Sequence, residues 1–180
     1  MRKRFWIGLT LVVAILGSAY AVFQQEEEML PIGSEAPNFK LTTLDGKEVE
    51  LSKLRGKPVY LDFWATWCGP CRAALPHTQQ MAKKYGEDAH ILTINLRESE
   101  ERVRAFMQRN NYDFTVLMDT DGAVAKAYRV NGIPAFVIID AQGKIQFVQV
   151  GYTPAIGRKL EAELRKAIRA SKGEEWTMHR

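Results

Sequence analysis

The only two cysteines of this 180-residue chain, Cys68 and Cys71, are separated by Gly69 and Pro70. An apolar run at residues 59–63 precedes them and a segment of helical character follows. We therefore expect the pair where a strand ends and a helix begins. Because a helix N-terminus favours the thiolate over the thiol, we interpret the pair as a redox dithiol. In this interpretation Cys68 attacks a substrate disulfide and Cys71 resolves the mixed disulfide.

A zinc site and a structural disulfide are the two other uses of such a pair. Zinc needs four ligands, and the sequence contains neither a second Cys-x-x-Cys nor a His-x-x-x-His. A disulfide across two intervening residues closes a very small loop, so it stabilises little through loop entropy. The redox interpretation is favoured, and we expect neither a metal nor another cofactor.

Asp62 is the one charged residue of the apolar run 59–63, and its neighbours Leu61 and Phe63 indicate that it is buried. A carboxylate buried without a cation has a raised pKa. Such a group behind the start of the helix could accept the proton of Cys71 while that thiol attacks. Asp62 is therefore a candidate catalytic base, and a solvated position at a sheet edge is the alternative.

Further residues are candidates for contact with a substrate. Trp67 directly precedes Cys68 and is expected to cover the site. Pro134 is either an ordinary residue at a strand start or a cis proline that brings backbone next to the cysteines. In the second case Ile133 could pair with an extended substrate segment. The candidate substrate-binding residues are Trp67, Gly69, Pro70, Ile133 and Pro134.

The elements that must position these residues alternate between strands and helices. Strands are predicted at residues 59–63, 89–95, 114–118, 134–140 and 145–150. Helices are predicted at residues 68–85, 99–110, 122–129 and 154–170, and a β-hairpin is predicted at residues 39–51. This order predicts an α/β fold, with a mixed central sheet, helices on both of its faces and an N-terminal β-hairpin extension.

Residues 5–23 carry no charge and are mostly apolar. At about 1.5 Å per residue they span roughly 28 Å, close to the hydrocarbon core of a bilayer. Basic residues at 2–4 precede the run, so the positive-inside rule keeps the N-terminus cytoplasmic and exports the rest. A single-pass cell-membrane anchor is favoured because apolar residues continue to Phe23. The alternative is a signal peptide cleaved near Ala21, which releases a secreted protein.

The predicted division of the chain is an anchor or signal peptide at 1–23, a tether at 24–31, one globular domain at 32–170 and a tail at 171–180. Of the 25 basic residues three lie at 2–4, which leaves 22 against 21 acidic residues. A nearly neutral domain without a basic stripe is a poor phosphate binder, so nucleic acid is not an expected partner. We expect a monomer.

Together these residues resemble the thioredoxin superfamily. The matching features are Trp-Cys-Gly-Pro-Cys at 67–71, Asp62, Pro76 and Gly-Ile-Pro at 132–134. The resemblance implies a thioredoxin-like fold for residues 32–170, with Cys68 as nucleophile and Cys71 as resolving cysteine. It also implies that Asp62 is the buried base and that Pro134 is cis.

A narrower resemblance, over residues 32–170, is to the ResA/TlpA-like group of membrane-tethered bacterial thiol–disulfide oxidoreductases. The motifs that carry it are IGSEAPNF at 32–39, LRGKPV at 54–59, DTDG at 119–122, YRV at 128–130 and IDAQGK at 139–144. The resemblance implies protein disulfides as substrates, including those of apocytochrome c during cytochrome c biogenesis, and a membrane thiol-electron donor.

Two positions depart from the ResA pattern. Gly69 stands where an acidic residue is common, and Asp62 stands where a neutral residue is common, so the site resembles a general thioredoxin more than an apocytochrome specialist. The Gly-Pro pair resembles reducing members, which favours a protein-disulfide reductase. A disulfide oxidase or isomerase is the alternative, because direction follows the reduction potential. A thiol peroxidase is less favoured, because residues 63–65 lack the proline expected before a peroxidatic cysteine.

Overall fold

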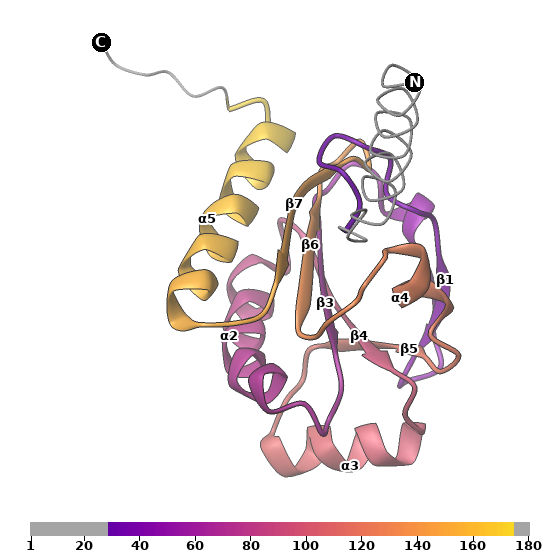
Figure 1. Ribbon diagram of the computed structural model, residues 1–180. Helices are drawn as coiled ribbons and strands as arrows, with labels where there is room; N and C mark the ends of the chain where they lie inside the picture. The colour runs from indigo at the N-terminus through magenta and orange to yellow at the C-terminus, as the bar shows by residue number, and fades with distance from the viewer. Residues whose placement is uncertain (1–28, 175–180) are drawn as a thin grey trace, which may run out of the picture.

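The computed structural model describes residues 29–174 and places its strands in one mixed sheet, in the order β2-β1-β5-β4-β3-β6-β7 (Figure 1). The strands are β1 (Lys40–Thr43), β2 (Glu48–Glu50), β3 (Val59–Trp64), β4 (His90–Leu96), β5 (Thr115–Asp119), β6 (Ala135–Ile139) and β7 (Ile145–Val150). β3, β4 and β5 run parallel, whereas β6 is antiparallel to β3 and β1 is antiparallel to β5. The predicted mixed sheet and N-terminal hairpin are confirmed.

Helices cover both faces of this sheet, as predicted. One face carries α2 (Gly69–Tyr85), α3 (Glu100–Asn110) and α5 (Pro154–Ser171), and the other carries α4 (Ala123–Ala127) and the 3-10 helix η1 (Leu51–Leu54). Parallel strands are joined by right-handed crossovers, so α2 and α3, which lead to successive neighbouring strands, lie on the same face. The chain then returns across the sheet to β6, which places α4 on the opposite face.

α4 is shorter than the helix predicted at residues 122–129. Gly122 before it and Arg129 after it both adopt left-handed backbone conformations, with φ of 75° and 53°. Such a conformation cannot continue a right-handed helix. The two oxygens of the Asp119 side chain accept the backbone N–H groups of Val124 and Ala125, at 3.1 and 2.8 Å. The helix is therefore fixed at its start by a carboxylate and ended by backbone geometry.

β3 is the central strand that positions the cysteine pair, and every residue of it is buried. Leu61 and Phe63 belong to the core on the α4 side, whereas Tyr60 and Trp64 pack on the side of α2. Side chains alternate along a strand, so Asp62 also faces α2. The sequence prediction of a strand covered on both faces is confirmed, and the one charged side chain of the strand lies beneath the helix that carries the cysteines.

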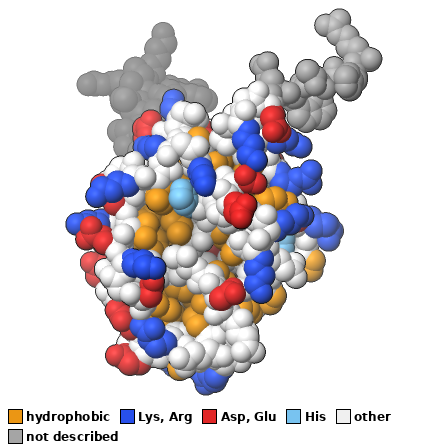
Figure 2. All heavy atoms as spheres, turned by 180° about the vertical axis from the view of Figure 1, so that it is seen from behind, with side chains coloured by type: hydrophobic (Ala, Val, Ile, Leu, Met, Phe, Trp, Pro, Cys, Tyr) orange, Lys and Arg blue, Asp and Glu red, His pale blue; other side chains and the backbone are white. Residues whose placement is uncertain are grey.

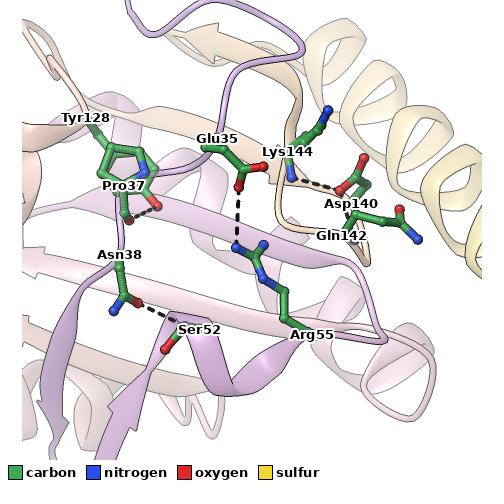
Figure 3. Close-up of polar contacts among 9 residues, drawn as sticks. All are labelled: Glu35, Pro37, Asn38, Ser52, Arg55, Tyr128, Asp140, Gln142 and Lys144. Atoms are coloured by element: carbon green, nitrogen blue, oxygen red, sulfur yellow. Dashed lines mark hydrogen bonds and ion pairs between the residues drawn. The ribbon is translucent and has the colours of Figure 1, made fainter.

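The segment before β1, residues 33–38, lies at the end of the domain opposite α3 (Figure 1). Gly33 and Ala36 donate backbone hydrogen bonds to Ile145 and Gly143, at 2.7 and 3.0 Å. Figure 3 shows side-chain contacts from the same region. The Tyr128 hydroxyl donates to the Pro37 carbonyl oxygen at 2.9 Å. The remaining contacts drawn join Glu35 to Arg55, Asn38 to Ser52, and Asp140 to Gln142 and Lys144.

The predicted membrane segment at 1–23, residues 24–28 of the tether and residues 175–180 of the tail lie outside the described residues. Within residues 29–174, no helix combines the length and apolarity needed to cross a membrane. The face shown in Figure 2 carries basic and acidic side chains side by side, with smaller apolar areas between them.

Candidate active site

Cys68 and Cys71 are joined by a disulfide at the start of α2, with a Cα–Cα distance of 5.2 Å. Cys68 is the N-cap of α2, and its Sγ accepts the backbone N–H of Cys71 at 3.2 Å. The cap position places this sulfur at the positive end of the helix, which favours a thiolate after reduction. Cys68 is 5% exposed and Cys71 is fully buried, so only Cys68 offers a surface to another molecule.

The Ile133–Pro134 peptide bond is cis, as the resemblance implied. Its segment lies against the cysteine pair, because Cys68 Sγ is 3.7 Å from the carbonyl oxygen of Ile133. Ile133 is half-buried, while Pro134 is buried and its carbonyl oxygen accepts the Gly151 N–H at 2.8 Å. The tertiary structure thus brings together residues that are 65 positions apart in the sequence.

Asp62 is fully buried beneath α2. Its Oδ2 accepts a hydrogen bond from the Thr78 hydroxyl at 2.8 Å, and its Oδ1 has no partner among the described residues. Burial raises the pKa of Asp62 from 3.8 to about 7, and the Thr78 hydroxyl opposes part of this rise. Thr78 lies two helical turns after Cys71 on the same buried stripe of α2. A carboxyl group whose pKa burial raises to about 7 therefore lies beneath the helix that carries the resolving cysteine.

The residues next to the cysteines occupy different environments. Gly69 and Pro70 form the first turn of α2, where a proline costs no helix hydrogen bond. A Cβ added at Gly69 would meet no atom within 4 Å, so space does not require glycine there. Trp67 is 67% exposed and lines a hollow between the start of α2 and helix α3. Its large exposed ring borders the reactive cysteine.

The AhpC/TSA family profile matches residues 32–148. The chain belongs to the AhpC/TSA family. Its relatives include the thiol–disulfide oxidoreductases ResA of Bacillus subtilis, 37% identical, and of Bacillus cereus, 34% identical. The match to the Bacillus subtilis protein covers 82% of this chain and 83% of that protein. The match to the Bacillus cereus protein covers 81% of this chain and 87% of that protein. These relatives confirm the predicted membership of the ResA-like group within the thioredoxin superfamily. They also confirm the predicted thiol–disulfide oxidoreductase activity.

Solved structures give the same assignment of the fold. A crystal structure from Chlorobium tepidum, provisionally assigned as a thiol:disulfide interchange protein DsbE, superimposes with a TM-score of 0.73 at 37% identity. The match covers 77% of this chain and 99% of the Chlorobium tepidum chain. This ResA-like protein therefore has the thioredoxin-like fold that its sequence predicted.

Thr78 is a site residue that the sequence analysis missed, although its spacing from Cys71 places both on one helix face. Its hydroxyl stabilises the charged form of Asp62.

In a Thr78→Val variant we expect the pKa of Asp62 to rise further, by about one unit, because a hydrogen bond to a charged group contributes about 1.5 kcal/mol. The measurement is the pH dependence of intramolecular disulfide closure, whose midpoint moves to higher pH. Thr78→Ser keeps the hydroxyl and is the matched control. Coinciding Val and wild-type profiles would contradict the assignment.

Glu98 is a second residue that the sequence analysis missed, because it stands in a charged segment that resembles a solvated loop. It is buried, and it holds the segment that leads to the cysteines. Its carboxylate accepts the backbone N–H and the hydroxyl of Thr66, at 2.7 and 2.6 Å, and the Asn95 amide at 2.9 Å. Arg102 lies 3.6 Å from the same carboxylate. Glu98 is thus a positioning residue for the segment before Cys68.

Removing this carboxylate is expected to destabilise the fold. Glu98→Ala leaves the Thr66 N–H and the Asn95 amide without an acceptor, which should lower the free energy of unfolding by about 2–4 kcal/mol. Glu98→Gln keeps one acceptor oxygen and should lose less. Urea denaturation followed by tryptophan fluorescence measures both. A Glu98→Ala variant as stable as the wild type would show that the contacts carry no net stability.

Proposed function

We propose that this protein reduces disulfides of exported proteins, on the outer side of the cytoplasmic membrane, through the Cys68–Cys71 dithiol. The observation that carries the proposal is the arrangement of a slightly exposed cysteine at a helix N-terminus, a fully buried cysteine one turn later and a buried carboxylate beneath the same helix. The first two perform disulfide exchange, and the third supplies the proton acceptor that resolution needs.

The reaction begins with the reduced protein. The Cys68 thiolate attacks one sulfur of a substrate disulfide, which forms a mixed disulfide and releases the other substrate sulfur as a thiolate. Asp62 accepts the proton of Cys71, and the Cys71 thiolate then attacks Cys68 Sγ. This step forms the Cys68–Cys71 disulfide seen here and releases the second substrate thiolate. Two electrons pass to the substrate, and a membrane thiol-electron donor must return them.

The cis-proline segment supports an extended substrate. Among the described residues, no backbone carbonyl accepts a hydrogen bond from the N–H of Ile133. The carbonyl oxygen of Ile133 faces Cys68. A substrate strand laid across this segment could exchange backbone hydrogen bonds with Ile133 while its cysteine reaches Cys68. Recognition through backbone accepts many sequences, which suits a reductase of several exported proteins, apocytochrome c among them.

The direction of the reaction is tested by redox equilibration with glutathione. We expect a midpoint potential more reducing than about −200 mV, on the side of thioredoxin-like reductants. A potential of about −120 mV, typical of strong oxidants, would instead indicate that the protein is an oxidase. Acid trapping and alkylation of the thiols, followed by mass spectrometry, gives the ratio of dithiol to disulfide directly. A double Cys68→Ser, Cys71→Ser variant provides the baseline.

The proposed location rests on the uncharged run at residues 5–23 and the basic residues before it. Carbonate extraction of membranes tests the anchor, and protease treatment of intact spheroplasts tests the orientation. Retention in the membrane pellet with loss of the domain to external protease is the expected result. Release into the medium, with a new N-terminus near Ala21, would replace the anchor with a cleaved signal peptide.

A further inference from the structure

A hollow of about 430 Å³ adjoins the reactive cysteine, and its lining is basic. Its residues come from the segment before Cys68, the first turn of α2 and the exposed side of α3. The lining residues are Thr66, Trp67, Arg72, Arg102, Phe106, Arg109 and Asn110. Figure 1 shows the start of α2 next to α3, so residues distant in sequence share this one surface.

The charge of this hollow is unbalanced. Arg102 contacts the buried carboxylate of Glu98, so its charge is partly compensated. Arg109 donates from Nε to the backbone oxygen of Ala105, and within residues 29–174 neither Arg109 nor Arg72 has an acidic partner. No acidic residue belongs to the lining. Two uncompensated guanidinium groups therefore face solvent beside an exposed tryptophan ring.

The position of the hollow relates it to the substrate. Trp67 is the residue directly before Cys68, and Arg72 is one helical turn after it, with its N–H bonded to the Cys68 carbonyl oxygen at 3.1 Å. Trp67 and Arg72 flank Cys68 along the chain, so both can contact a substrate held by disulfide to Cys68. Guanidinium groups bind carboxylates in preference to other side chains, and the indole face accepts an apolar or aromatic side chain.

We propose that this hollow selects substrates whose cysteine is flanked by acidic residues, with their carboxylates on Arg72 and Arg109 and an apolar neighbour on Trp67. The inference rests on the proposed disulfide-exchange function and names its substrate class. Cysteines in basic segments are disfavoured by the same charges. Because the guanidinium groups are exposed, the preference is moderate and decreases with salt.

The test uses synthetic peptides joined by one intermolecular disulfide, with Glu, Gln or Lys on both sides of the cysteine. Reduced full-length protein should react with the Glu peptide about fivefold faster, in kcat/KM, than with the Gln peptide, and more slowly still with the Lys peptide. The Glu-to-Gln ratio should approach one in high salt. Using a ratio removes any effect of the substitutions on the reactivity of Cys68 itself.

Charge reversal makes the test independent of folding defects. The Arg72→Glu, Arg109→Glu variant should prefer the Lys peptide over the Glu peptide, a gain that a misfolded protein cannot show. Arg165→Gln, on the exposed side of α5, is the matched control and should keep the wild-type ratios. Equal rates for all three peptides in the wild type would overturn this inference alone. Absence of exchange with every peptide would overturn the proposed function and this inference with it.

Discussion

Replacing Cys71 with serine is expected to abolish turnover and to leave substrates attached to Cys68. The attack of Cys68 needs only its own thiolate, but release of the second substrate thiol needs the sulfur of Cys71. We expect turnover to fall by roughly three orders of magnitude or more, because the two cysteines act as a unit. Purification of the tagged variant under acid-quenched conditions, followed by mass spectrometry, identifies the attached proteins and therefore the substrates.

The burial of the two sulfurs supplies the control. Cys71 is fully buried and Cys68 reaches the surface, so the mixed disulfide forms on Cys68 only. The Cys68→Ser variant keeps Cys71 but should carry no adducts. Adducts recovered equally from both single variants would reverse or remove the assigned roles. A Cys71→Ser variant that carries none would show that Cys68 does not attack disulfides in the cell.

Replacing Asp62 with asparagine is expected to slow disulfide closure while leaving the first attack intact. The amide is close in size to the carboxylate but cannot accept the proton of Cys71. Positioned bases contribute about 100-fold or more, so closure at pH 7 should slow by roughly 10- to 100-fold. Alkylation of Cys68 by iodoacetamide, which needs no resolving step, should change little. Unchanged closure kinetics would remove Asp62 from the mechanism.

The same substitution is expected to stabilise the oxidised protein at alkaline pH. The pKa of Asp62 is 3.8 in an ordinary environment and about 7 in the folded protein. Between these values the native state binds one proton more than the unfolded state, so the stability of the wild type falls as pH rises. Asparagine does not titrate, so the stability of the Asp62→Asn variant does not fall with pH for this reason. Its advantage in free energy of unfolding should grow by about 2–3 kcal/mol between pH 5 and pH 8.

Denaturant unfolding of both proteins at the two pH values measures this difference. A constant advantage across the pH range would mean that Asp62 titrates alike in the folded and unfolded chains, against its complete burial. Slower closure together with higher stability would indicate that the buried carboxylate is retained for catalysis, at the expense of the fold.

Much of this site was readable from residue types and short spacings. The Cys-x-x-Cys pair, the apolar strand before it and the helix after it are local patterns, because strand and helix periodicities act over a few residues. Asp62 could be recognised for the same reason, since a single charge inside a buried strand is conspicuous. The order of strands and helices predicted the mixed sheet, because strands joined by a helix run parallel and strands joined by a short hairpin run antiparallel.

The contacts between distant segments were decided only by the tertiary structure. Ile133 lies next to Cys68, and Glu98 holds Thr66, across separations of 65 and 32 residues. Glu98 resembled a solvated charge, because a sequence does not show whether a carboxylate will find buried donors. The basic hollow likewise exists only where α3 packs beside the start of α2. The sequence determined which chemistry this protein can perform. The packing of helices on the sheet determined the environment of Asp62 and the surface that a substrate contacts.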